Sequence, residues 1–337
     1  MTDVMEIGNE QIHLGEKKAI ELHLGRLYDY TELTMPVEVI RGKEPGPTIF
    51  VSGALHGDEL IGAAIVKNLL NDKRLKELKG TLIAIPIVNV FGFNTRSRYL
   101  PDRRDLNRCF PGSAQGSLGA RIASLLIQEV VKKCQYGIDF HSGAIHRENL
   151  PQIRTCFECG PNKELAEAFG APVVLNSKLR EGSLRAIAAE LGVQVLVFEG
   201  GEALRVNERV LKVGLAGAIS VMETVGMLPK SNRKKSTQTY IANSSYWVRA
   251  PQAGMIQLSK TLGSKVKGGT TLGKITDAFG RNVSKVTAPS EGVIIGIAKL
   301  PLVNKGDALF HIATFEDSDI VRELAAELND YGEQLYL

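Results

Sequence analysis

Cysteine is scarce in this sequence, and long apolar runs are missing from it. Four cysteines occur in 337 residues, which argues against the disulfide framework of a secreted protein. No stretch approaches the ~18 consecutive apolar residues that a membrane-spanning helix needs. The first ten residues, MTDVMEIGNE, lack the basic and apolar segments of an export signal. We therefore expect a cytoplasmic protein with no membrane partner.

A large excess of charge of one sign is also missing. The formal net charge is only +4, and lysine and arginine are scattered along the chain, so we expect no nucleic-acid partner. Hydrophobic residues make up 44% of the sequence and charged residues 23%, which is typical of a globular protein. The length is sufficient for a larger and a smaller core.

Cys156 and Cys159 stand in a CxxC spacing. Such a pair can form half of a zinc site or a redox couple. Because no second CxxC completes a tetrahedral set, we expect ordinary structural thiols here.

From about residue 38, short β-rich runs alternate with amphipathic stretches. The strand candidates are TIFVSGA, TLIAIPIVNV, YGIDFH, PVVLNS and VQVLVFEGG. Between the first two, Ile61, Ile65 and Leu69 repeat on one helical face. The alternation predicts βαβ units, and thus a doubly wound, mostly parallel α/β sheet with helices on both faces. We assign residues 1–240, including the N-terminal strands, to this domain.

The texture of the sequence changes near residue 241. Short β-like runs punctuated by glycine fill residues 241–316, and an Ala-Pro, Gly, strand, Lys-Gly, strand phrase occurs twice. This pattern predicts a small all-β domain built from two interlocked halves of a sandwich. Residues 317–337 are expected to form a helix followed by a tail.

Metal-competent side chains follow two of the predicted strands. His56 and Glu59 come directly after an apolar run, and His141 closes another. Strand ends of a parallel sheet deliver side chains to one edge, so these three groups can meet there. Two histidines and one glutamate form the open ligand set of catalytic zinc.

The residues alone leave an ordinary alternative open. A histidine at a strand end is commonly a hydrogen-bonded structural residue, and the HxxE spacing is a weak signal. Asp139 shares a strand face with His141 and can either orient that ligand or cap nearby backbone. Asp58 is expected to turn away and hold the loop.

A polar, arginine-rich loop, NTRSRYLPDRRDLNRCFPGS, lies between the proposed ligands. Such a loop either carries function or solvates a surface. Asn107 and Arg108 within it can grip a carboxylate through amide and bidentate hydrogen bonds. Glu199 ends a later apolar strand and is a candidate general base.

Four ordered motifs, GALHGDE, RYLPDRRDLNRCFPG, DFHSG and VFEGG, resemble those of the succinylglutamate desuccinylase and aspartoacylase family. This family belongs to the zinc carboxypeptidase superfamily, and the resemblance covers roughly residues 38 to 230. It implies a zinc-carboxypeptidase-like, mixed sheet. It also implies one zinc ion held by His56, Glu59 and His141.

The resemblance further implies roles for five residues. Glu199 would activate the attacking water and later protonate the leaving amine. Arg98 would polarise the scissile carbonyl. Asn107 and Arg108 would bind a substrate carboxylate, and Arg185 would bind a carboxylate on the acyl side.

Two features of the sequence depart from the family or extend it. The segment before DLNR is longer than in aspartoacylase proper, and Arg103 and Arg104 within it could compete with Arg98 for its role. The C-terminal domain is similar to the barrel-sandwich fold of lipoyl and biotinyl domains but lacks a hairpin that presents a carrier lysine. Two roles stay open for this domain: capping the mouth of the site, or forming a homo-oligomer interface.

Together these features predict a zinc-dependent amidohydrolase that cleaves the amide bond of a small N-acylated amino acid. One alternative is a zinc carboxypeptidase acting on peptides, which would need an open cleft. Another is a non-catalytic scaffold in which the metal is structural.

Overall fold

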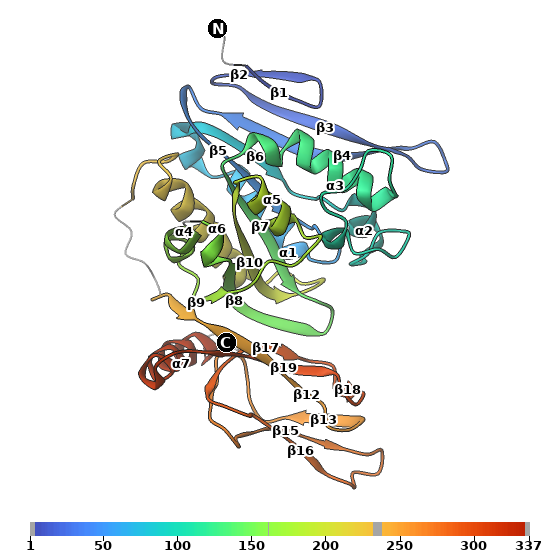
Figure 1. Cartoon of the computed structure of the whole chain (residues 1–337), viewed down its shortest axis with the longest axis vertical. Helices are drawn as coiled ribbons and strands as arrows, with labels where there is room; N and C mark the ends of the chain where they lie inside the picture. Colours follow the sequence, from blue (N-terminus) through green and yellow to red (C-terminus); the bar gives the residue numbers. More distant parts are fainter. Residues whose placement is uncertain (1–3, 161, 232–237, 334–337) are drawn as a thin grey trace.

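A large mixed sheet organises the protein (Figure 1), seen in a computed structural model that describes residues 4–160, 162–231 and 238–333. In spatial order the sheet runs through β12 (Ser244–Arg249), β19 (Ala308–Thr314), β17 (Gly292–Ala298), β8 (Arg147–Thr155), β10 (Gln194–Glu202), β7 (Tyr136–Gly143), β5 (Glu44–Gly53), β6 (Lys79–Ile85), β4 (Glu32–Arg41) and β3 (Lys17–Arg26). Three further strands attach beside this path: β9 (Val173–Asn176), β11 (Tyr240–Ala242) and β14 (Lys265–Val266). The central strands β10, β7, β5 and β6 are parallel, and β4 and β3 are antiparallel to their neighbours. β8 is antiparallel to β10 and β17 and parallel to β9. The predicted mixed α/β class is confirmed.

Helices cover both faces of the central strands. One face carries α1 (Leu60–Leu70), α4 (Asn162–Phe169) and α6 (Glu208–Thr224), and the other carries α2 (Val90–Thr95), α3 (Leu118–Glu129) and α5 (Leu184–Glu190). Successive strand residues point to opposite faces, so Val51 packs under the first set and Phe50 under the second. Short 3₁₀ turns lie at Lys73–Glu77, Leu106–Arg108, Val131–Lys133 and Phe157–Cys159.

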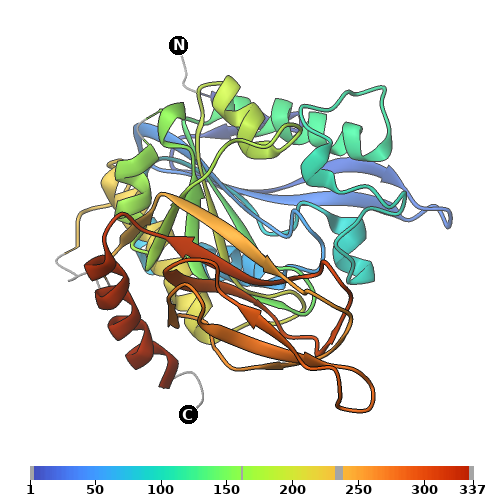
Figure 2. The same cartoon turned by 60° about the horizontal axis from the view of Figure 1, so that its bottom comes forward.

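The C-terminal strands form a second layer while remaining joined to the first sheet. A four-stranded antiparallel sheet comprises β16 (Ser284–Thr287), β15 (Thr271–Thr276), β13 (Gly254–Leu258) and β18 (Leu302–Val303). It encloses a core with β12, β17 and β19, in which Ile256, Leu272 and Phe310 are buried. Because β17 pairs antiparallel with β8, the large sheet continues from the α/β part into the C-terminal part, as Figures 1 and 2 show.

The last helix, α7 (Ser318–Glu333), packs beside this junction (Figure 2). Its Val321, Leu324 and Leu328 share a hydrophobic cluster with Leu150 of β8 and Val293 of β17. The predicted terminal helix is therefore present, and the end of the tail, residues 334–337, lies outside the described residues. At the opposite end of the chain, β1 (Val4–Ile7) and β2 (Glu10–His13) form a separate antiparallel pair.

The CxxC pair differs from the expectation of free structural thiols. Cys156 and Cys159 are joined by a disulfide, so that expectation is wrong. The 3₁₀ turn between them brings the two Cα atoms to 5.4 Å, within the range that a disulfide can bridge. Among the described residues, no helix combines the length and apolar character needed to cross a bilayer.

Close contact between two glycines fixes α1 on the sheet. A Cβ on Gly62 would lie 2.6 Å from the carbonyl oxygen of Phe140 and 2.9 Å from Cα of Gly53. Neither backbone atom can move without shifting a central strand. The first turn of α1, which follows Glu59, is thereby held against the ends of β5 and β7.

We predict that Gly62→Ala destabilises the protein by about 1–3 kcal/mol, because the added methyl group overpacks this contact. Helix propensity alone predicts the opposite sign, a gain of about 1 kcal/mol. Denaturant unfolding measures the difference, and Asn68→Ala on the exposed face of the same helix is the control. A Gly62→Ala variant as stable as the wild type would contradict the packing argument.

Candidate functional site

The loop that carries His56 and Glu59 is shaped by tight backbone contacts. After β5 ends at Gly53, Ala54 adopts a positive φ of 49° and turns the chain. A Cβ on Gly57 would lie 2.0 Å from the carbonyl carbon of Gly92 in α2, so only glycine fits there. The loop is thus pressed between the sheet and α2, and both side chains point back toward the end of β7.

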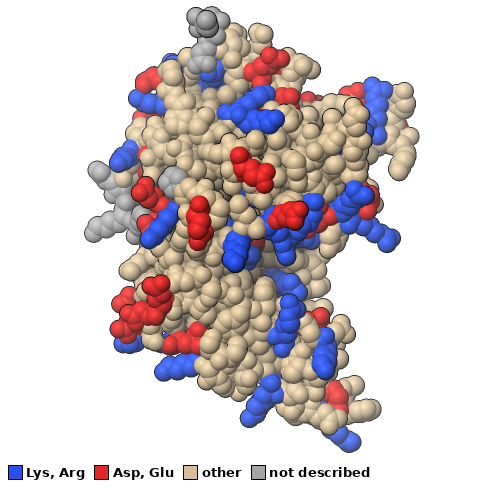
Figure 3. Space-filling view, in the orientation of Figure 1, with Lys and Arg blue, Asp and Glu red and all other residues tan. Residues whose placement is uncertain are grey.

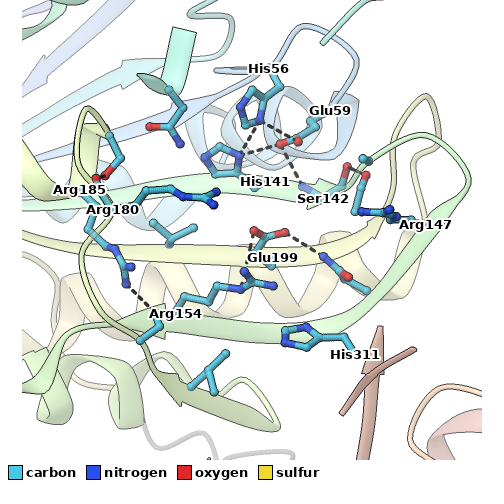
Figure 4. A pocket seen from close by; sticks show the side chains of 18 of the residues that line it. His56, Glu59, His141, Ser142, Arg147, Arg154, Arg180, Arg185, Glu199 and His311 are labelled. Carbon is cyan, nitrogen blue, oxygen red and sulfur yellow. Dashed lines mark hydrogen bonds and ion pairs between the residues drawn. The ribbon is translucent and has the colours of Figure 1, made fainter. Parts of the chain in front are cut away.

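Three metal-competent side chains converge at this point, as Figure 4 shows. His56 Nδ1 lies 2.8 Å from Glu59 Oε1, and His141 Nδ1 lies 2.7 Å from Glu59 Oε2. The two Nδ1 atoms are 3.2 Å apart. All three side chains are buried. The structure therefore brings together the three residues predicted as metal ligands, with one donor atom of each facing a common point.

Carboxylates hold the outer nitrogens of both imidazoles. His141 Nε2 lies 2.7 Å from Asp139, whose other oxygen accepts a hydrogen bond of 2.7 Å from Ser52. His56 Nε2 lies 3.0 Å from Asp105. Such partners place the proton on Nε2 and leave Nδ1 free to act as a ligand. Of the two roles left open for Asp139, orientation of His141 matches this contact.

Burial and charge act in opposite directions on this cluster. Burial disfavours the charged imidazoles, but Glu59 and the outer carboxylates outweigh it and raise the pKa values of His56 and His141. Burial also opposes ionisation of Glu59, yet the two histidines lower its pKa. Three carboxylates and two imidazoles thus form a cluster that favours the binding of positive charge.

Asp58, between the two loop ligands, has its backbone rather than its side chain engaged. Its carbonyl oxygen accepts hydrogen bonds from the N–H groups of Leu60 and Leu204. Burial, together with the negative charge of Glu59, raises the pKa of its carboxyl group. The expectation that Asp58 holds the loop agrees with the two backbone bonds.

Arg98 is the arginine of the polar loop that reaches the cluster. It donates to Glu59 at 3.0 Å and to Asp105 at 3.1 Å, and its side chain is 25% exposed. Arg103 and Arg104 are exposed, and Arg104 lies 3.6 Å from Asp102. Position alone therefore distinguishes Arg98 from its two neighbours, because it can reach a substrate beside the cluster.

Glu199 sits on β10 next to His141, its register partner on β7. Figure 4 shows its carboxylate below the histidine cluster. Oε2 accepts a hydrogen bond of 2.9 Å from Asn149, and Oε1 lies 3.8 Å from Arg154. A carboxylate held in this way at the edge of a cavity can exchange a proton with a molecule bound there.

All eight residues predicted for the site line one cavity of about 710 Å³. They are His56, Glu59, Arg98, Asn107, Arg108, His141, Arg185 and Glu199. The Asn107 side chain also accepts a hydrogen bond from the N–H of Leu184 at the start of α5. Arg185 donates to Ser177 and to the Lys178 carbonyl. Burial and nearby Arg154 lower its pKa to about 10.

The cavity is strongly cationic. Among the described residues, its basic lining side chains are Arg98, Arg108, Arg147, Arg154, Lys178, Arg180 and Arg185. The acidic ones are Glu59 and Glu199. Figure 3 shows basic side chains gathered where the α/β part meets the C-terminal strands. Anionic groups are therefore favoured in this cavity.

Asp105, which contacts His56, and the cavity residues Arg154 and Arg180 were not predicted from the sequence. Asp105 is the first residue of the DLNR motif and precedes the 3₁₀ turn Leu106–Arg108. Its place in that motif was the sequence signal that could have marked it as a site residue. Arg154 lies in β8, a strand of mixed polarity with the sequence RENLPQIRT, and Arg180 lies in a loop between β9 and α5. Nothing in their local sequence distinguishes them from surface arginines.

C-terminal strands supply one wall of the cavity. Ser245 and Trp247 come from β12, and His311 comes from β19. Trp247 stacks on His311 with ring centroids 4.5 Å apart, and the Arg147 guanidinium lies 5.4 Å from the Trp247 ring centre. His311 is buried and lines the cavity.

His311 is neutral in the folded protein. Burial, with the charge of Arg154, lowers its pKa to about 3. Its Nε2 lies 2.8 Å from the Ser245 hydroxyl. In the unfolded chain the imidazole has a pKa near 6.5. Below that pH the unfolded state therefore binds a proton that the folded state does not bind.

We predict that His311 makes the protein acid-sensitive between pH about 6.5 and pH about 3. His311→Gln removes this proton uptake, so the loss of unfolding free energy on acidification should shrink by up to roughly 3 kcal/mol at pH 4. Denaturant titrations at pH 7, 5 and 4 measure the free energy of unfolding of both proteins. The exposed His23 provides the control variant His23→Gln. Parallel stability curves for wild type and His311→Gln would refute the assignment.

Comparisons with known proteins agree with the motifs. A deacetylase of Halomonas elongata, N-alpha-acetyl-L-2,4-diaminobutyric acid deacetylase, is 27% identical over 304 residues, which are 84% of this chain and 86% of the relative. The crystal structure of a succinylglutamate desuccinylase/aspartoacylase from Rhodobacter sphaeroides superimposes with a TM-score of 0.80 at 23% identity, covering 89% of this chain and 96% of that one. The product-bound Ectoine utilization protein EutE (DoeB) from Ruegeria pomeroyi gives 0.82 at 23% identity, covering 90% and 98%. At this identity the structural likeness concerns the fold.

The model of the succinylglutamate desuccinylase/aspartoacylase catalytic domain matches residues 45–225. This segment contains the ligand loop after β5, the polar arginine loop, the end of β7 and Glu199 on β10. The chain belongs to the succinylglutamate desuccinylase/aspartoacylase family.

Proposed function

We propose that this protein is a zinc-dependent amidohydrolase that cleaves the amide bond of a small N-acylated amino acid. The observation that carries this proposal is the convergence of His56, Glu59 and His141 beside Glu199 in one cationic cavity. The family membership and the deacetylase relative support hydrolysis of an amide bond.

The donor set fits a single zinc ion. Two imidazole Nδ1 atoms and one carboxylate lie within 4.8 Å of one another, and each imidazole has its Nε2 on a carboxylate. Three protein ligands of these types leave room for further coordination in catalytic zinc sites. When bound, zinc supplies Lewis-acid chemistry, polarising the carbonyl and making water more acidic.

The chain's own residues perform the proton transfers. Glu199 accepts a proton from the attacking water and later donates it to the nitrogen of the leaving amine. Arg98 donates hydrogen bonds to the carbonyl oxygen as negative charge develops there, an effect worth about 3 kcal/mol for one well-placed donor. Its guanidinium has five N–H donors, so its bonds to Glu59 and Asp105 leave others for the substrate.

Binding would come from the remaining predicted residues. Asn107 and Arg108 hold one carboxylate of the substrate, and Arg185 holds a second carboxylate on the acyl side. The deacetylase relative is named for N-alpha-acetyl-L-2,4-diaminobutyric acid, a compound with one carboxylate and a free amine. The excess of basic groups in this cavity favours an N-acyl amino acid with two carboxylates instead.

We also propose a division into three parts: a catalytic α/β domain of residues 1–240, a barrel-sandwich domain of the lipoyl type at 241–316, and a terminal helix and tail at 317–337. The buried cluster between the four-stranded sheet and β12, β17 and β19 supports the middle unit. Because β12 and β19 line the cavity, this unit forms one wall of the proposed substrate site.

The proposed function predicts which substrates are cleaved. With N-acetyl and N-succinyl amino acids and N-alpha-acetyl-2,4-diaminobutyric acid, we expect metal-dependent amine release. A second carboxylate should raise kcat/KM by about 10- to 100-fold, since a charge-assisted hydrogen bond contributes about 1.5–3 kcal/mol.

Arg185→Gln should reduce this preference, and Arg205→Gln, which changes an exposed arginine outside the cavity, is the matched control. If the zinc-bound protein releases no amine from any compound of the panel, the proposal is wrong. Faster cleavage of short peptides than of N-acyl amino acids would favour a carboxypeptidase.

The proposed function also predicts the effect of replacing Glu199. Glu199→Gln keeps the shape of the side chain but removes the proton acceptor, so kcat should fall by about 10²- to 10⁴-fold. The zinc content should be unchanged, because Glu199 is not one of the three ligands. Turnover and metal analysis of the purified variant test this, and wild-type-like turnover would remove Glu199 from the mechanism.

A further inference from the structure

The proposed base is held by an amide from the neighbouring strand. Asn149 on β8 donates its side-chain N–H to Glu199 Oε2 at 2.9 Å. Asn149 is only 7% exposed, so its side chain is confined. With Oε2 bonded to the Asn149 amide and Oε1 lying 3.8 Å from Arg154, the rotamer of Glu199 is restrained.

Strands from both parts of the protein fix the backbone of Asn149. On one side it is the register partner of Gly201 in β10, two residues after Glu199. On the other side it is the register partner of Gly296 in β17. Asn149 therefore lies on the strand that joins the catalytic sheet to the C-terminal strands.

Gly296 leaves the space that the Asn149 amide occupies. A Cβ on Gly296 would lie 3.0 Å from Asn149 Oδ1 and 3.1 Å from Cβ of His311. Gly296 does not have a positive φ, so its backbone conformation is open to other residues. A side chain here is disfavoured by close contact with the Asn149 amide and Cβ of His311 rather than by the backbone conformation.

We propose that Asn149 is a positioning residue for Glu199, and that the C-terminal strand β17 keeps it in place by presenting Gly296. The proposal rests on the proposed function, in which Glu199 transfers the proton. It gives the C-terminal strands a part in the chemical step, beyond their place in the cavity wall.

The effect should fall on kcat. Displacing a reacting group by about 1 Å can cost on the order of 100-fold in rate. Asn149 is not one of the proposed metal ligands, and its side-chain N–H bonds the proposed base. Loss of its amide should therefore lower kcat at least about tenfold while KM and zinc content change little.

A double-mutant cycle tests the coupling. Wild type, Asn149→Ala, Gly296→Ala and the double variant are compared for kcat, KM and zinc content on the best substrate of the N-acyl panel. Gly296→Ala should lower kcat severalfold in the wild-type background, because its methyl group displaces the amide. In the Asn149→Ala background the same change should cost less kcat, since the amide is gone and only the contact with Cβ of His311 remains.

Two further variants test whether the loss of kcat comes from the N–H donor of Asn149. Asn149→Asp keeps the shape of the side chain without its N–H donor, so it should lose kcat even if the alanine variant folds poorly. Glu148→Gln removes the negative charge from another contact between β8 and the C-terminal part, the 2.7 Å ion pair with Lys299, and should leave kcat unchanged.

The outcomes separate the two proposals. A wild type that turns over the substrate, with Asn149 variants of normal kcat or with effects that simply add, would overturn the positioning role alone. A wild type without turnover would overturn the proposed function and this inference together. Non-additive losses of kcat with constant zinc content would establish the role of Asn149.

Discussion

Close approach of two imidazoles and one carboxylate is the constraint on which the site depends. His56 and His141 present Nδ1 atoms 3.2 Å apart, and both contact Glu59. Such a buried group is stable only if its outer atoms are also satisfied, which Asp105 and Asp139 achieve on the two Nε2 atoms. The strand ends, the polar loop and the start of α1 must all meet at this point.

Sheet continuity is the second constraint. Pairing of β8 with β17 extends the catalytic sheet into the C-terminal part. Adjacent strands are only about 5 Å apart, so side chains of β10, β8, β17, β19 and β12 fall side by side. This arrangement places Trp247 and His311 in the cavity wall. The C-terminal strands thus contribute to the cavity, although they lie outside the ordered motifs of the sequence.

Much of the site could be predicted because its residues stand at strand ends within ordered motifs. His56, Glu59, His141 and Glu199 each follow or end an apolar run, and parallel strands bring such ends to one edge. Arg154 could not be predicted, because it becomes a cavity residue only when β8 is placed beside β10. The disulfide of the CxxC pair was equally invisible, since spacing alone does not distinguish it from two thiols.

The α/β class, the family and the positions of the predicted ligands follow from periodicity and short motifs, which are local properties of the chain. Long-range contacts in the folded protein show which arginine reaches the cluster, that Asp105 contacts His56, and that β19 lines the cavity. These contacts join residues far apart in the chain, and their existence depends on strand order and register. Strand pairing is a long-range choice, so local sequence signals do not contain it.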